Sequence, residues 1–96
     1  MQNTSNLRIE FSTLFDKKLR QLPSEIIIAF QETHDLFLEN PTDETLRRHF
    51  LKEKYTGYQS IDVTPNYRAM FKEIKTETQT IIKFYTIGTH EELYGK

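Results

Sequence analysis

Apolar and polar residues alternate from Leu7 to Phe11, with the two-residue period of a strand that buries one face. We therefore expect a strand over residues 6–11. The apolar spacing then lengthens to that of a helix over residues 12–22, where Ser12 or Thr13 can supply the N-cap.

A second helical pattern runs over residues 23–40. Pro23 lies in its first turn, where the missing amide N–H is tolerated. Asn40 precedes Pro41, and a residue before proline disfavours helical geometry, so the helix is expected to end there. Because Pro23 also interrupts the first helix, the two segments predict an αα-hairpin.

The two-residue period returns in the second half of the chain. It predicts a β-meander, three strands joined by two polar turns, over residues 58–64, 67–75 and 79–88. A turn or short helix over 41–50 and a short strand over 49–54 are expected before it. The predicted order is β-α-α-β-β-β-β, an α+β fold in which two N-terminal helices cover one face of a mostly antiparallel sheet. The other face is left open for a substrate.

Composition narrows the class of protein. The 96 residues are expected to form a single domain, 1–96. The absence of cysteine excludes a disulfide framework, thiolate chemistry and a zinc knuckle, and it fits a reducing cytoplasm. The N-terminal "MQNTSNLRIEF" lacks the apolar core of a signal peptide, and no stretch approaches the roughly 18 apolar residues of a membrane span. We expect a cytoplasmic protein with no membrane segment.

Charge is unevenly distributed along a chain whose net charge is −1. Residues 25–44 hold six Asp or Glu and no Lys or Arg, whereas residues 46–75 hold seven Lys or Arg against three Asp or Glu. A local basic region can bind a phosphate backbone on a nearly neutral protein. A nearly neutral chain is nevertheless a weak polyanion binder by default. Two interpretations of the basic region therefore remain: a solvated charged surface and a surface that binds nucleic acid.

The three histidines, His34, His49 and His90, lack the close spacing of a metal motif, so no metal and no cofactor is expected. His34 lies in the second predicted helix among apolar residues and is expected to be partly buried. If the first and last of the four C-terminal strands bring His49 and His90 to the open face, they can form an acid–base pair near neutral pH.

Two polar clusters have both a structural and a functional interpretation. A hairpin can bring Asp62 next to Arg68, either as a cross-strand ion pair or as an arginine that holds a phosphate in its forked guanidinium. The segment "KEKYTGYQ" places Lys52 and Lys54 beside tyrosines. This pattern suits stacking on RNA bases beside phosphate contacts, and it equally suits a tyrosine-rich strand that packs into the core.

Two motifs give the chain a family resemblance. "HFLKEKYTGYQSIDVTPNYRAMFKE" followed by "IIKFYTIGTHEELYG" resembles the small bacterial toxins of the RelE/ParE superfamily, and most of all the YafQ-type branch of type II toxin–antitoxin systems. The resemblance covers residues 7–95. It implies a small α+β domain with helices packed on a curved antiparallel sheet, in agreement with the order derived above.

The resemblance implies a ribosome-dependent endoribonuclease that cleaves mRNA and inhibits translation, with a cognate antitoxin, the ribosome and mRNA as partners. In such toxins the ribose 2′-OH attacks the adjacent phosphate. The implied catalytic positions are His49, Asp62, Asn66, Arg68, His90 and Tyr94. RNA contacts are expected from Lys52, Lys54, Tyr55, Tyr67 and Lys72.

The chain departs from the YafQ pattern at two of these positions. Asp62 stands where that branch has a second histidine, and Asn66 stands where it has an aspartate after the turn proline. A carboxylate repels phosphate, and an amide does not readily transfer a proton. These departures leave open an attenuated nuclease and a degenerate, non-catalytic protein that binds an antitoxin. A further alternative with the same fold is a ParE-like inhibitor of DNA gyrase.

Overall fold

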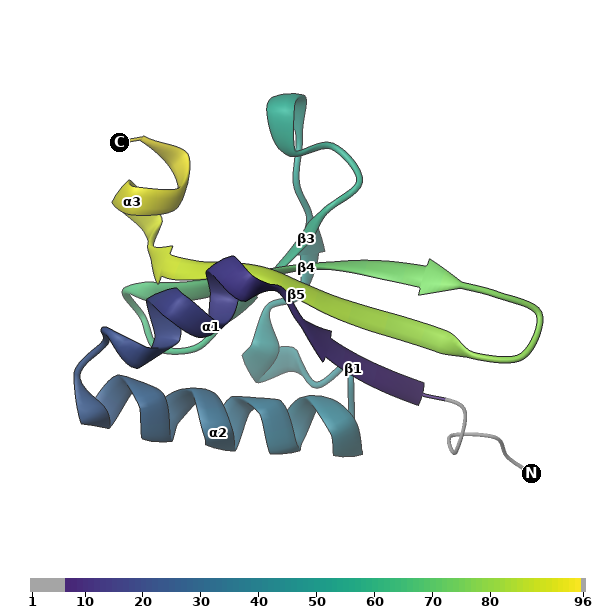
Figure 1. Ribbon diagram of the computed structural model, residues 1–96, viewed down its shortest axis with the longest axis horizontal. Helices are drawn as coiled ribbons and strands as arrows, with labels where there is room; N and C mark the ends of the chain where they lie inside the picture. Colours follow the sequence, from purple (N-terminus) through teal and green to yellow (C-terminus); the bar gives the residue numbers. More distant parts are fainter. Residues whose placement is uncertain (1–6, 96) are drawn as a thin grey trace.

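The computed structural model describes residues 7–95, which form one five-stranded mixed sheet beside two long helices (Figure 1). The strands lie in the order β1-β5-β4-β3-β2. β1 runs parallel to β5, and the other neighbouring strands are antiparallel. The strands are β1 Leu7–Phe11, β2 His49–Phe50, β3 Gln59–Asp62, β4 Tyr67–Lys75 and β5 Thr80–Thr89.

The helices are α1 Thr13–Arg20, α2 Ser24–Glu39 and α3 His90–Tyr94, with 3₁₀ turns η2 Glu44–Leu46 and η3 Glu53–Tyr55. The two predicted helices are present, with each end within two residues of the predicted position. The Ser12 hydroxyl caps α1 by accepting the amide of Phe15 at 2.9 Å, Pro23 is the N-cap of α2, and Asn40 is its C-cap. In Figure 1, α2 runs below the sheet and α3 lies above the end of β5.

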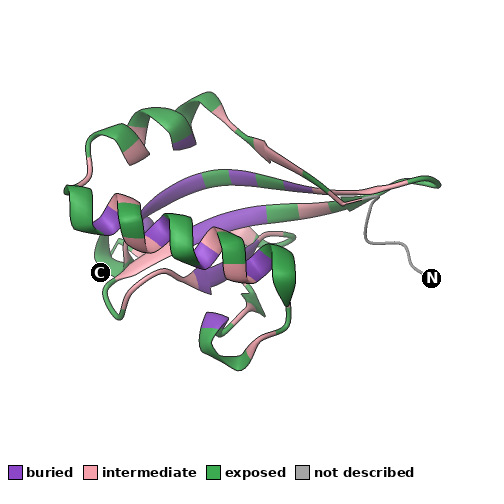
Figure 2. Ribbon diagram, turned by 90° about the horizontal axis from the view of Figure 1, so that it is seen from below, coloured by how far each residue is buried: buried purple, intermediate pink, exposed green. Residues whose placement is uncertain are grey.

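A cluster of aromatic rings joins the helices to the sheet. Phe84, fully buried on β5, has its ring centroid within 6.1 Å of five other phenylalanine rings, Phe11, Phe15, Phe30, Phe37 and Phe71. These rings come from β1, α1, α2 and β4, so one side chain connects four elements. Figure 2 shows the matching burial pattern, with buried positions along one side of α2 and along β3, β4 and β5.

The opposite face of the sheet is covered at Ser60, Met70 and Thr86 and open around Asp62 and Arg68, which are partly exposed. Side chains of directly paired residues project on the same side of a sheet. One row of paired residues is His49, Ser60, Met70 and Thr86. The next row is Asp62, Arg68 and Gly88. This open face is the one on which the sequence predicts a substrate, and α3 curls back over its end.

The predicted α+β fold and the order of elements along the chain are confirmed, with local differences. β2 has two residues instead of six, because Lys52 to Tyr55 turn into a 3₁₀ segment in which Glu53 adopts a positive φ of 58°. The C-terminal tail forms α3. The statements made above about residues 1–6 lie outside the described part of the chain. Over residues 7–95, no helix has the length and apolarity needed to cross a membrane.

We expect Phe84→Ala to lower the free energy of unfolding by about 3–5 kcal/mol, because it removes a buried ring and leaves a cavity among four elements. Urea denaturation measures this change. Ile74→Ala is the control, since Ile74 is 41% exposed and its truncation is expected to cost no more than about 0.5 kcal/mol. Equal losses for the two variants would contradict the central place of Phe84.

Candidate active site

A hollow of about 350 Å³ lies on the open face where β2, β3, β4 and α3 meet. Five of the six residues predicted to be catalytic line it. The lining residues are Arg47, Arg48, His49, Asp62, Arg68, His90 and Tyr94. Residues separated by more than forty positions in the sequence are thus brought to one site by the strand order.

The tautomer of His49 follows from one hydrogen bond. Its Nδ1 lies 2.8 Å from the carbonyl oxygen of Arg47. A carbonyl oxygen can only accept a hydrogen bond, so Nδ1 carries the proton. In the neutral ring the lone pair is therefore on Nε2, which is the arrangement a general base needs.

The turn before His49 is fixed by local bonds. The Thr45 hydroxyl and then its backbone N–H donate to Asp43, at 2.6 and 2.9 Å, and they lower the pKa of this carboxyl below its ordinary value. The contribution of these two hydrogen bonds to folding stability is therefore present above the ordinary pKa of aspartate, and it is lost as the pH falls through the lowered pKa of Asp43. Arg47 then takes a left-handed conformation, φ 50° and ψ 42°, which reverses the chain into β2.

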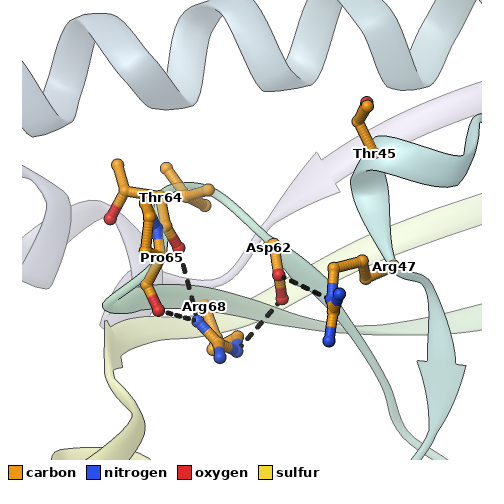
Figure 3. Close-up of a pocket in the computed structure, with 7 residues that line it drawn as sticks. Thr45, Arg47, Asp62, Thr64, Pro65 and Arg68 are labelled. Atoms are coloured by element: carbon orange, nitrogen blue, oxygen red, sulfur yellow. Dashed lines mark hydrogen bonds and ion pairs between the residues drawn. The ribbon is translucent and has the colours of Figure 1, made fainter.

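Asp62 bridges two arginines (Figure 3). Its Oδ1 lies 3.1 Å from Arg68 Nε and its Oδ2 lies 3.3 Å from Arg47 Nε. Asp62 and Arg68 are directly opposite in the β3–β4 ladder, so the predicted cross-strand pair is present. Both carboxylate oxygens are thus occupied by guanidinium groups.

Arg68 is held on a second side by main-chain oxygens. Its Nη1 donates to the carbonyls of Pro65 at 2.9 Å and Thr64 at 3.3 Å. The other terminal nitrogen, Nη2, has no hydrogen-bond partner among residues 7–95. The guanidinium is therefore oriented by the protein and retains two N–H donors for an anion.

Helix α3 presents His90 and Tyr94 together. Their rings meet edge to face with centroids 4.6 Å apart, as expected for residues one helical turn apart. The helix begins with a capping box, in which Thr89 Oγ1 accepts the Glu92 amide and the Glu92 carboxylate accepts the Thr89 amide. The Tyr94 hydroxyl is buried and has no hydrogen-bond partner among the described residues.

Two contacts attach α3 to the rest of the protein. Tyr55, on η3, donates its hydroxyl to the carbonyl of Leu93 at 2.8 Å. The His90 amide donates to the carbonyl of Asn66 at 3.2 Å. Asn66 therefore contributes its backbone, and its exposed side chain does not line the hollow. The structure does not bring the Asn66 amide into the predicted catalytic set.

The residues predicted to contact RNA fall in different places. Lys52, Lys54 and Tyr55 line a second hollow of about 450 Å³ that shares His49 and Tyr94 with the first. Lys72 lies on the open face with its Nζ 4.9 Å from the centroid of the Tyr58 ring.

Tyr67 is placed apart from these residues. It directly precedes Arg68 in β4, and successive strand residues point to opposite faces, so its side chain is on the helix side. His34 is partly buried on α2 beside the rings of Phe11 and Phe30, as predicted, and lies outside the hollow.

Sequence reasoning missed Arg47 and Arg48 as site residues. The signal available was the run "RRH", which sets two guanidinium groups directly before His49. Arg48 Nε donates to Gln59 at 2.7 Å, its Nη2 pairs with Glu73 at 3.3 Å, and its guanidinium lies over two phenylalanine rings. These contacts anchor the start of β2. Over residues 7–95, no three His, Asp or Glu side chains gather as a metal site would require.

Comparison with known proteins places the fold. No protein-family model matches the chain, and no curated protein matches it significantly. YafQ from E. coli strain BL21(DE3) superposes with a TM-score of 0.73 at 23% identity, over 91% of this chain and 97% of that one. YafQ in the E. coli DinJ-YafQ toxin–antitoxin complex gives 0.71 at 21% identity, over 94% and 99%.

The YoeB/ParE toxin from Agrobacterium tumefaciens superposes with a TM-score of 0.70 at 10% identity, over 86% of this chain and 98% of that one. At these identities the likeness establishes the fold. The chain therefore has the RelE-like fold that the sequence motifs predicted, and solved structures of YafQ are among its neighbours.

We expect Glu92→Ala to loosen α3, because it removes one half of the capping box. A loss of about 1 kcal/mol in local stability corresponds to roughly fivefold faster exchange of the Gly95 amide, which donates to the carbonyl of Glu91. Amide hydrogen exchange measures this. Glu91→Ala is the matched control, because it removes the same charge from the same turn without the capping bond. Equal exchange rates in both variants would contradict the cap's role.

Proposed function

We propose that the protein is the toxin of a type II toxin–antitoxin system, a ribosome-dependent endoribonuclease that cleaves mRNA and thereby stops translation. One observation carries the proposal: His49, Arg68, His90 and Tyr94 line a single hollow on the open face of a RelE-like fold. The site of action would be the translating ribosome in the cytoplasm.

The arrangement of these residues suits a transesterification within the RNA, in which one ester bond to the phosphorus forms as another breaks. His49 Nε2 accepts the proton of the ribose 2′-OH, and the 2′ oxygen bonds to the adjacent phosphorus. The bond from that phosphorus to the 5′ oxygen breaks, and protonated His90 donates its proton to the departing oxygen. The products are a 2′,3′-cyclic phosphate and a free 5′-hydroxyl.

The remaining residues stabilise charge and position the substrate. Arg68 Nη2 donates to the phosphate oxygens, on which negative charge accumulates in the transition state. Tyr94 packs against the His90 ring and orients it. Asp62, whose two oxygens are already bound to arginines, acts in this scheme as a positioning residue and not as the base.

A cognate antitoxin is the proposed protein partner. Neighbouring structures include the DinJ-YafQ toxin–antitoxin complex from E. coli and the RelBE2 toxin–antitoxin complex from Mycobacterium tuberculosis. By analogy, a flexible antitoxin segment would cover the basic surface of residues 46–75 and neutralise the toxin.

The most direct test replaces His49 by Gln, which keeps a polar side chain and removes the proton acceptor. We expect cleavage of mRNA in a purified translation reaction to slow by about 10²-fold or more. His34→Gln is the matched control, because His34 lies on α2 away from the hollow, and its cleavage rate should stay at that of the wild type. Equal activity of the two variants would contradict the assignment of His49.

The wild-type protein separates the three classes of function. We expect mRNA to be cut when ribosomes are present and to stay intact as naked RNA, and we expect growth arrest when the gene is induced without an antitoxin. Inhibition of gyrase supercoiling without RNA cleavage would favour the ParE-like alternative. Normal growth with retained antitoxin binding would favour a degenerate, non-catalytic protein.

A further inference from the structure

Asp62, Arg47 and Arg68 form an ion bridge that lines two hollows, and the proposed reaction uses only one of them. These three residues belong to the wall of the catalytic hollow and also to the wall of a neighbouring hollow of about 490 Å³. The neighbouring hollow is completed by Thr45, Val63, Thr64 and Pro65 (Figure 3). The ion bridge therefore forms the boundary between two open concavities.

The guanidinium groups in this wall have unused donors. Each arginine forms an ion pair with the carboxylate of Asp62 through its Nε. Both terminal nitrogens of Arg47, and Nη2 of Arg68, have no hydrogen-bond partner among residues 7–95. A guanidinium that is already paired at Nε has its terminal nitrogens available for a phosphate. Less side-chain entropy is then lost when the phosphate binds.

The two arginines are held to different degrees. Arg68 is held by the ladder register opposite Asp62 and by the carbonyls of Pro65 and Thr64. Arg47 is 76% exposed at its side chain and projects from the left-handed residue that ends η2. In the free protein the carboxylate of Asp62 lies between the two guanidinium groups and offsets their mutual repulsion, a role that the charge of a bound phosphate can take over.

We propose that Arg47 and Arg68 form a two-arginine phosphate clamp, with Asp62 as the internal counterion that holds the clamp together in the free protein. Arg47 is then a substrate-binding residue, and Asp62 is a positioning residue that lies between two phosphate-binding groups. Since the wall faces both hollows, an RNA strand that crosses it would place one nucleotide on each side of the clamped phosphodiester.

The carboxylate has two opposing effects on an incoming phosphate. It orients both arginines, and it repels the anion over a few ångströms. The clamp is expected to assemble on phosphate without the charge of Asp62, because the bound phosphate then supplies the negative charge between the two arginines while the carbonyls of Thr64 and Pro65 hold Arg68 Nη1. Loss of the charge should therefore tighten phosphate binding, whereas loss of either arginine should weaken it.

Binding of adenosine 3′-monophosphate, followed by NMR titration of the full chain at low salt, tests the clamp. We expect Arg47→Gln to bind about fivefold more weakly than the wild type, and Asp62→Asn to bind about fivefold more tightly. Arg47→Lys should fall between Arg47→Gln and the wild type, because an ammonium keeps the charge and loses the fork. Arg8→Gln is the matched control, since Arg8 is an exposed arginine paired with Glu10 on β1.

Unchanged binding by Arg47→Gln would remove Arg47 from the clamp. Equal or weaker binding by Asp62→Asn would show that the carboxylate does not compete with phosphate, and would overturn its role as a counterion that the bound phosphate replaces. Thermal denaturation checks that each variant folds. The Arg47 variants test the clamp even if Asp62→Asn fails to fold.

The clamp rests on the proposed function only for the identity of its ligand as an RNA phosphodiester. Phosphate binding with the expected variant pattern, but without mRNA cleavage, would leave the clamp standing and refute the ribonuclease.

Discussion

The alternation of side chains along β4 is the constraint on which the rest of the molecule depends. Ala69 and Phe71 point to the helices and join the aromatic core around Phe84, while Arg68 points to the open face. The core and the candidate site are thus two faces of the same strands. Since a one-residue slip of register would exchange the faces, packing of the phenylalanine rings also fixes where the charged residues lie.

Most of the fold could be predicted because its signals are local. The two-residue period marked β1, β3, β4 and β5, and Ser12, Pro23 and Asn40 marked the helix ends. The length of β2 could not be read from the pattern. Its apolar Phe50 is 68% exposed, so hydrophobicity did not report burial there, and the chain leaves the sheet through a strained residue, Glu53.

The candidate site was predictable in part for a different reason. His49, His90 and Tyr94 were identified through motifs, and the structure brings them to one hollow with Arg68. The part played by Arg47 depends on a left-handed backbone conformation and on a carboxylate that comes from another strand. Neither is encoded in the spacing of residues 47–49. Asn66 had the right position in the motif, but the turn directs its side chain outward.

The parallel pairing of β1 with β5 has a consequence for how the protein folds during its synthesis. Among residues 7–95 the first strand, β1, lies against the last, β5, so a nascent chain cannot complete this sheet until residues 80–89 have emerged. Long-range closure of this kind slows folding. His90 and Tyr94 follow immediately after β5, so the chain acquires its core and its last site residues at nearly the same moment. The site is therefore assembled only together with the core, because a partly synthesised chain that lacks β5 also lacks His90 and Tyr94.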